Sequence, residues 1–155
     1  MRDGFVKVAA ITPKIRVADI DYNCRIICEY MSVAEDKHIK VAVFPELCIT
    51  GYTCQDLFFQ EELLLKAKDA LLYITKHSTT LDGLYFVGVP YDINGKLYNM
   101  AVAISHGKII GMVPKVYLPN YNEFYEARFF TSGKSLDEII IIDGQCVPVK
   151  SKMLF

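Results

Sequence analysis

Apolar residues in the first half of the chain fall into short runs that predict strands. Residues 5–11 form the first run, which Lys7 interrupts. Residues 41–44 are apolar and rich in β-branched side chains, so we expect a strand that is buried on both faces. A third run covers residues 84–89, and Pro90, which lacks a backbone donor, is expected near the end of its strand.

Between these runs, two segments carry apolar side chains at the spacing of a helix. Asp19 can cap a helix that continues to about Lys37, and Asp56 can begin a second helix that ends near residues 77–80. Each helix is expected to bury one apolar stripe. The two stripes comprise Ile20, Cys24, Ile27, Cys28, Met31 and Ala34 in the first helix, and Leu63, Ala67, Ala70, Leu71 and Ile74 in the second.

The second half of the chain predicts hairpins. Three dipeptides typical of tight turns separate runs of strand character, and they are Asn94-Gly95, His106-Gly107 and Asp143-Gly144. The strands expected beside them cover residues 97–105, 108–113, 138–142 and 145–149. Strands that alternate with helices and then form hairpins predict an α/β fold, with a mixed sheet and two helices on one face.

Composition narrows the class of protein. The chain has 155 residues, so a single domain is expected, and 52% apolar and 23% charged residues are ordinary for a soluble globular protein. A net charge of −1 without a basic stripe argues against a nucleic-acid partner. No apolar run approaches the roughly 18 residues of a membrane span, and the N-terminal residues do not resemble a secretory signal.

The cysteines favour a reducing, cytoplasmic compartment. Their odd number and the lack of a signal predict free thiols, and no CxxC pair or suitably spaced histidine suggests a zinc site. Cys24 and Cys28 are expected to be small core residues of the first helix. The five cysteines are Cys24, Cys28, Cys48, Cys54 and Cys146.

Two ionic residues follow strands in the same way. Pro45 ends one predicted strand and Glu46 comes next, while Pro114 and Lys115 follow the strand over residues 108–113. The carboxyl ends of strands are where open α/β sheets place their chemistry, so the two side chains meet if their strands are neighbours. The pair fits a structural ion pair, and it equally fits a general base beside a cation that stabilises negative charge.

The segment over residues 114–134 is long and has no clear period. Loops of this length in compact domains are usually functional or disordered. Its aromatic side chains argue against disorder. They are Tyr117, Tyr121, Phe124, Tyr125, Phe129 and Phe130.

Two motifs resemble those of a known family. Phe44-Pro45-Glu46-Leu47 with Thr50-Gly51-Tyr52 is similar to the catalytic-glutamate motif of the nitrilase (carbon–nitrogen hydrolase) superfamily. Pro114-Lys115, followed by residues 118–121 and 123–129, more narrowly resembles the glutaminase domain of glutamine-dependent NAD synthetase. Residues 54–58 also fit that family, and the similarity extends from about residue 5 to residue 155.

This resemblance implies part of a nitrilase-type α-β-β-α sandwich and a Glu–Lys–Cys triad that hydrolyses the side-chain amide of glutamine. The cysteine forms a thioester, the glutamate acts as general base and then acid, and the lysine stabilises the oxyanion. Carried across, Glu46 is the base and Lys115 the oxyanion partner. Tyr52 and Tyr121 would line the glutamine pocket, and Glu126 would orient Lys115.

The resemblance also implies partners. Glutamine is the substrate, and the released ammonia passes to an NAD synthetase domain that amidates nicotinic acid adenine dinucleotide. That domain uses ATP and magnesium, whereas the glutaminase part needs no cofactor.

The chain departs from the family pattern at the nucleophile. The family's cysteine lies downstream of the lysine loop in a Cys-Glu-Asp tripeptide, which this sequence lacks. Cys28-Glu29-Tyr30 lies on the first helix, and Cys146 lies in a hairpin without the matching context. We therefore expect residues 1–155 to form an incomplete glutaminase domain without the synthetase domain, inactive alone and self-associating as a homo-oligomer.

Two alternatives stay open. The first is another amidase of the superfamily, such as an ω-amidase, carbamoylase or nitrilase, although the motif over residues 118–126 argues against it. The second is a non-catalytic binding or assembly module on the same scaffold, which glutamine binding without turnover would support.

Overall fold

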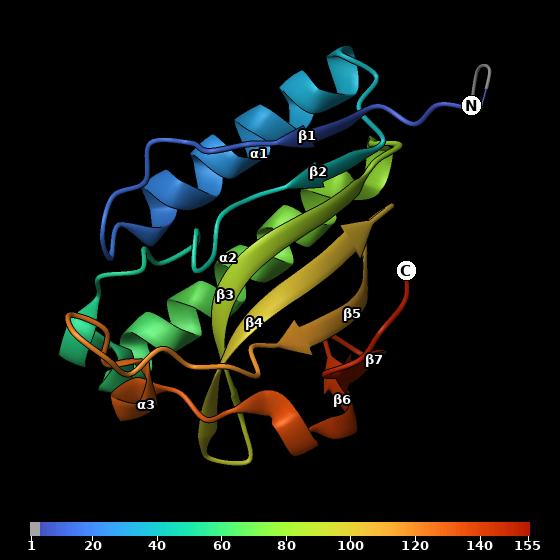
Figure 1. Ribbon diagram of the computed structural model, residues 1–155. Coiled ribbons are helices and arrows are strands. Elements are labelled where there is room, and N and C mark those ends of the chain that lie inside the picture. The colour runs from blue at the N-terminus through green and yellow to red at the C-terminus, as the bar shows by residue number, and fades with distance from the viewer. Residues whose placement is uncertain (1–3) are drawn as a thin grey trace.

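The computed structural model describes residues 4–155, in which seven strands form one mixed sheet (Figure 1). The strand order is β1-β2-β3-β4-β5-β7-β6. The strands are β1 (Val8–Ala10), β2 (Val41–Val43), β3 (Leu84–Ile93), β4 (Lys96–Ser105), β5 (Lys108–Pro114), β6 (Asp137–Ile142) and β7 (Gln145–Lys150). The predicted strand over residues 5–11 is thus confirmed in a shorter form.

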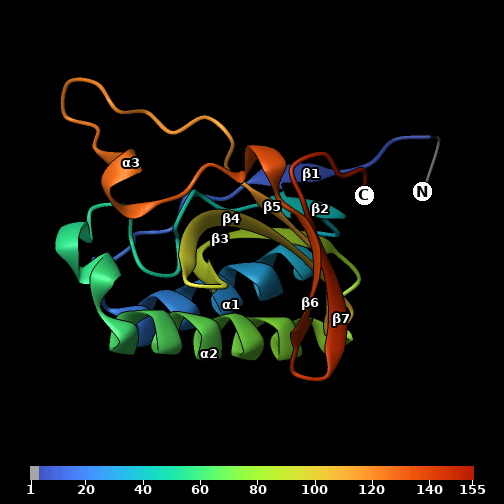
Figure 2. The same cartoon turned by 90° about the horizontal axis from the view of Figure 1, so that it is seen from below.

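Two long helices, α1 (Ile20–Asp36) and α2 (Glu61–His77), pack on one face of this sheet (Figure 2). The expected fold class, a mixed sheet with two helices on one face, is confirmed. The two predicted apolar stripes are buried in full, including Cys24 and Cys28. A short helix α3 (Glu126–Phe129) and the 3-10 segments Gln55–Phe59, Ser78–Thr80 and Gly133–Ser135 complete the elements. No helix in the described part of the chain is long and apolar enough to cross a membrane.

The two predicted helix starts have different outcomes. Asp19 caps α1 as expected, because its side chain accepts a hydrogen bond from the Tyr22 backbone N–H at 3.2 Å. The prediction for Asp56 is wrong, because α2 begins at Glu61 after a separate 3-10 segment. The Asp56 carboxylate instead pairs with the Arg128 guanidinium at 3.0 and 3.3 Å, which satisfies it without a helix end.

Strand direction changes along the sheet. β1, β2 and β3 are parallel, whereas β3, β4 and β5 form antiparallel hairpins and β5 is parallel to β7. All three predicted turns are confirmed, and both residues of each dipeptide adopt positive φ, from 47° at Asp143 to 75° at Gly95. β3 does not stop near Pro90 but continues to Ile93.

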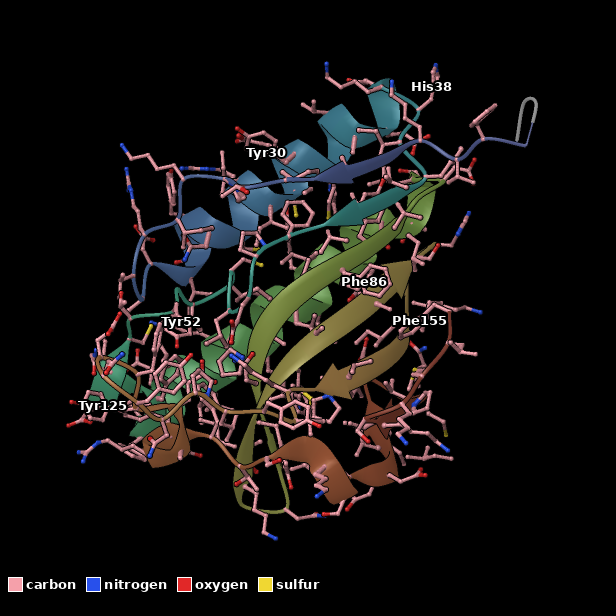
Figure 3. The ribbon with its side chains drawn as sticks, viewed as in Figure 1. Tyr30, His38, Tyr52, Phe86, Tyr125 and Phe155 are labelled. Atoms are coloured by element: carbon pink, nitrogen blue, oxygen red, sulfur yellow. The ribbon has the colours of Figure 1, made fainter. Side chains whose placement is uncertain are left out.

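The expectation that residues 41–44 are buried on both faces is wrong. Ala42 is 1% exposed, but Val43 is 47% exposed because α1 and α2 both cover the other side of the sheet. On this open face, the Phe155 ring packs against Phe86 with centroids 5.3 Å apart, and the two side chains lie together in Figure 3. The described residues thus supply one sheet and one helical layer, and the other two layers stay an expectation.

Self-association stays a prediction, and a substitution on the open face of the sheet can test it. Ile139 is 70% exposed on β6, on the side of the sheet opposite the buried Val147. Large exposed apolar patches promote association. We expect Ile139→Lys to reduce the mass measured by light scattering, while Leu65→Lys on the exposed side of α2 leaves it unchanged. A wild-type chain that is monomeric at all concentrations would contradict this prediction.

Candidate active site

A tight turn after β2 holds Glu46. The Phe44 N–H still donates to the Phe86 carbonyl at 2.9 Å, but Pro45 ends the ladder. Leu47 then adopts a left-handed φ of 51°, and its carbonyl accepts from the Gly51 N–H at 2.7 Å. The hydrogen-bonded turn therefore places Glu46 just beyond the carboxyl end of β2.

This turn lies directly on β3 at Gly88. A Cβ atom at residue 88 would lie 2.2 Å from the Leu47 nitrogen and 2.7 Å from the Pro45 carbonyl oxygen, so only glycine fits. The Cys48 thiol is buried here and accepts a hydrogen bond from the Gly88 N–H at 3.4 Å. Cys48 is thus a packing residue of this turn.

Lys115 lies between two glutamates. Its Nζ is 2.7 Å from Glu46 Oε1 and 2.8 Å from Glu126 Oε1. Glu46 is 40% exposed and Lys115 27% exposed, whereas Glu126 is buried at 4%. The predicted meeting of Glu46 with Lys115 and the predicted contact of Glu126 with Lys115 are both present.

The meeting does not arise from neighbouring strands. β3 and β4 lie between β2 and β5, and their two antiparallel pairings leave β2 and β5 running in the same direction. The carboxyl ends of β2 and β5 therefore reach the same edge of the sheet, from which the side chains of Glu46 and Lys115 converge.

The two carboxylates keep Lys115 charged. Burial lowers the pKa of Lys115, but hydrogen bonds and charge from Glu126 and Glu46 outweigh burial and raise it above its ordinary value. The ammonium group is therefore available as a fixed positive charge near neutral pH.

Tyr52 contacts this cluster through Glu126. Its hydroxyl donates to Glu126 Oε1 at 2.6 Å, the same oxygen that Lys115 contacts. Burial, followed by the neighbouring Glu126, raises the pKa of Tyr52, so the phenol stays neutral and acts as a donor. Its role in lining the glutamine pocket stays a prediction.

Tyr121 lies farther from the charges. It is 63% exposed, and its ring centroid lies 5.6 Å from that of Phe124, which in turn lies 6.5 Å from Tyr52. The three rings form an aromatic row beside the cluster, and pocket-lining by Tyr121 stays a prediction.

The loop that carries Glu126 is tied to the rest of the chain. The Glu126 N–H donates to the Pro119 carbonyl at 3.2 Å, and the Phe130 ring packs 5.0 Å from Phe58. Arg128 pairs with Asp56 and not with Glu126, so the carboxylate of Glu126 remains directed at Lys115.

A pocket of about 320 Å³ opens beside Glu46 and Lys115. Asn99 adds an amide to its wall, and apolar side chains such as Val43 and Phe86 form much of the rest. A carboxylate beside an ammonium group in such surroundings can move a proton and stabilise a developing negative charge.

None of the cysteines in the described residues lines this pocket. Cys24 and Cys28 are buried on α1, and Cys54 donates to the Thr50 carbonyl at 3.1 Å under the turn. Cys146 is exposed on β7, where it faces Ile141 of β6. All five thiols are free, as predicted. Residues 4–155 also contain no group of three or more His, Cys, Asp or Glu side chains that could hold a metal ion.

Sequence reasoning missed Asn99. Its Nδ2 donates to Glu46 Oε1, and its main-chain carbonyl accepts from the Lys115 N–H at 2.8 Å. A signal was available, because Asn99 is a polar residue inside the apolar run over residues 97–105, and a buried amide needs a partner.

The fold and this charge cluster define a nitrilase-type domain, in which an α/β sheet presents a glutamate and a lysine at one edge. The chain belongs to the carbon-nitrogen hydrolase family, whose sequence pattern matches residues 7–151.

Two glutamine-dependent NAD(+) synthetases are similar to the chain in sequence. The chain is 38% identical over 152 residues, 98% of its length, to the glutamine-dependent NAD(+) synthetase of Mycobacterium tuberculosis. It is 32% identical over 131 residues, 84% of its length, to the synthetase of Thermotoga maritima. The chain spans 22% of the length of each of these relatives.

Solved structures agree on the fold. A glutamine-dependent NAD(+) synthetase from Cytophaga hutchinsonii superposes with a TM-score of 0.88 at 25% identity, covering 94% of this chain and 25% of that one. An amidase from Nesterenkonia sp. gives a TM-score of 0.72 at 18% identity, covering 97% of this chain and 56% of that one. The likeness to the amidase concerns the fold alone.

Proposed function

We propose that this chain is part of a glutaminase domain that releases ammonia from glutamine for NAD synthesis. The observation that carries the proposal is Lys115 held between Glu46 and Glu126, in a chain 38% identical to a glutamine-dependent NAD(+) synthetase. ATP and magnesium belong to the synthetase reaction, and the proposal assigns neither to residues of this chain. The free thiols support a cytoplasmic location.

The proposed reaction uses the cluster as follows. Glu46 takes the proton of a cysteine thiol, whose sulfur attacks the carboxamide carbon of glutamine, and Lys115 stabilises the oxyanion. The oxyanion collapses to a thioester as the C–N bond breaks, and Glu46 returns its proton to the departing ammonia. Water then hydrolyses the thioester to glutamate and restores the thiol.

Glu126 and Tyr52 support this chemistry without reacting. The Glu126 carboxylate gives Lys115 a second contact beside that of Glu46, and the Tyr52 hydroxyl donates to the same carboxylate. Positioning of this kind lowers the barrier because reacting groups are held in place before the substrate binds.

The thiol is not assigned to any of the five cysteines. Four are buried in packing positions, and Cys146 lies on β7, outside the pocket. The proposal therefore expects this chain alone to release no ammonia.

The test measures ammonia release from L-glutamine by residues 1–155 and by any longer translation product of the same gene. We expect no release from residues 1–155. In a longer active product, Glu46→Gln and Lys115→Met should each lower kcat by at least about 100-fold, because each removes a group that acts in the transition state. Lys68→Met, at an exposed position of α2, is the matched control and should leave kcat unchanged.

The outcomes separate the alternatives. Ammonia release by homogeneous residues 1–155 would overturn the assignment of the thiol, and its loss in Cys146→Ser would reassign that role. Unchanged kcat in both the Glu46 and the Lys115 variants would overturn the proposed function. Calorimetric binding of glutamine without turnover by the longer product would favour a binding module.

A further inference from the structure

Asn99 contacts both members of the ion pair. It lies near the middle of β4 and is 4% exposed, and its side-chain amide donates to Glu46 Oε1. Its main-chain carbonyl accepts a hydrogen bond from the Lys115 N–H at 2.8 Å. A buried amide costs free energy unless it is paired, so this polar residue in an apolar strand needs the Glu46 carboxylate.

The register of the sheet fixes where Asn99 lies. It pairs with Pro90 of β3, and its carbonyl faces Lys115 on the other side of β4. The pair of Pro90 with Asn99 is therefore one of the pairs without mutual hydrogen bonds, which explains why a proline fits inside β3. A slip of one residue would turn the Asn99 side chain to the opposite face.

The two oxygens of Glu46 are not equivalent. Oε1 accepts from both Asn99 Nδ2 and Lys115 Nζ, whereas no side chain among the described residues donates to Oε2. Oε2 is thereby left to exchange a proton with a reacting group. An amide restrains the carboxylate through a hydrogen bond without placing a second positive charge beside it.

We propose that Asn99 is a positioning residue that holds Glu46 Oε1 against Lys115 and leaves Oε2 as the proton-accepting atom. The functional part of this inference rests on the proposed role of Glu46 as base. The positioning itself is a property of the folded chain and can be measured without substrate.

The first experiment follows the titration of Lys115 by NMR of 13C-methylated lysines in residues 1–155. Part of the elevation of the Lys115 pKa comes from Glu46, so a Glu46 carboxylate released from Asn99 should raise it less. We expect the Lys115 midpoint in Asn99→Leu to fall by about 0.5 pH units. In the Glu46→Gln background, Asn99→Leu should cause no further fall, because Asn99 acts through Glu46.

Gln145→Leu is the matched control. Gln145 is also a strand amide, and its side chain exchanges two hydrogen bonds with the backbone of Ile109, away from Glu46. Its loss should leave the Lys115 midpoint unchanged. An unchanged midpoint in Asn99→Leu, or a fall of equal size in the Glu46→Gln background, would overturn the proposal.

A second measurement needs no change at residue 99. In a 15N–1H spectrum, a side-chain amide proton of Asn99 should move upfield in Glu46→Ala, because its charged acceptor is gone. An unmoved signal would overturn the proposal even if Asn99→Leu fails to fold. Neither readout involves glutamine or a thiol, so failure of the proposed function would leave both results intact.

Discussion

Replacing Gly88 by alanine should destabilise the fold by about 3 kcal/mol and displace Glu46 from Lys115. The new Cβ would lie 2.2 Å from the Leu47 nitrogen and 2.7 Å from the Pro45 carbonyl oxygen, and both are backbone atoms of the turn that carries Glu46. Backbone cannot rotate away as a side chain can, so β3 and the turn must separate. Urea unfolding followed by circular dichroism measures the free-energy change.

Gly111→Ala is the control for this prediction. Gly111 is also a buried strand glycine, but a Cβ there would meet the Met153 sulfur at 2.4 Å, which belongs to a flexible side chain. We expect a cost below about 1 kcal/mol, because Met153 can move aside. Equal costs for the two variants would show that the close approach of the turn to Gly88 is not what requires glycine.

Replacing Lys115 by methionine should lower the free energy of unfolding by about 2–3 kcal/mol. The substitution keeps much of the side-chain volume but leaves the buried Glu126 carboxylate without its cation and close to a second carboxylate, Glu46. Breaking one side of a buried ion pair is costly because the remaining charge stays desolvated. Lys68→Met, on an exposed surface of α2, should change stability by less than about 0.5 kcal/mol.

The dependence on pH tests the same interaction. The folded chain raises the pKa of Lys115 above its ordinary value. The stabilisation that charged Lys115 gives to the folded chain is therefore complete below the pKa of an unfolded lysine, about 10.4. It is lost as the pH rises through the higher pKa of Lys115 in the folded chain. Wild type and Lys115→Met should differ in stability at pH 8 and converge at alkaline pH. A constant difference in stability between the two proteins across this pH range would show that the charge of Lys115 is not the cause of the stabilisation.

Much of the fold follows from local patterns. The helices α1 and α2 each bury one apolar stripe, from Ile20 to Ala34 and from Leu63 to Ile74. The helical spacing of these apolar residues in the sequence predicts both stripes. The turns at Asn94 and Asp143 are set by residues that tolerate positive φ. The start of α2 could not be predicted in the same way, because the partner of Asp56 is Arg128, 72 residues away.

In the candidate site, too, some features follow from local sequence patterns and others arise only in the folded chain. The prolines before Glu46 and Lys115 mark the strand ends, and family motifs indicate Glu126. Gly88 acts through a close backbone contact that the sequence does not display, and although Asn99 stands out as a polar residue in an apolar run, its partner depends on strand register. The bond between Tyr52 and Glu126 joins residues 74 positions apart and needs the folded loop.

These contacts join residues that lie far apart in the sequence, and this affects how the site is assembled. Glu46 and Lys115 are 69 positions apart, and Asp56 and Arg128 are 72 apart, so each contact closes a large loop of chain. Contacts of high sequence separation cost more loop-closure entropy than the local contacts of a helix or a hairpin. During synthesis, the charge cluster must wait until α3 has emerged from the ribosome, and its appearance would report that the central strands have already joined.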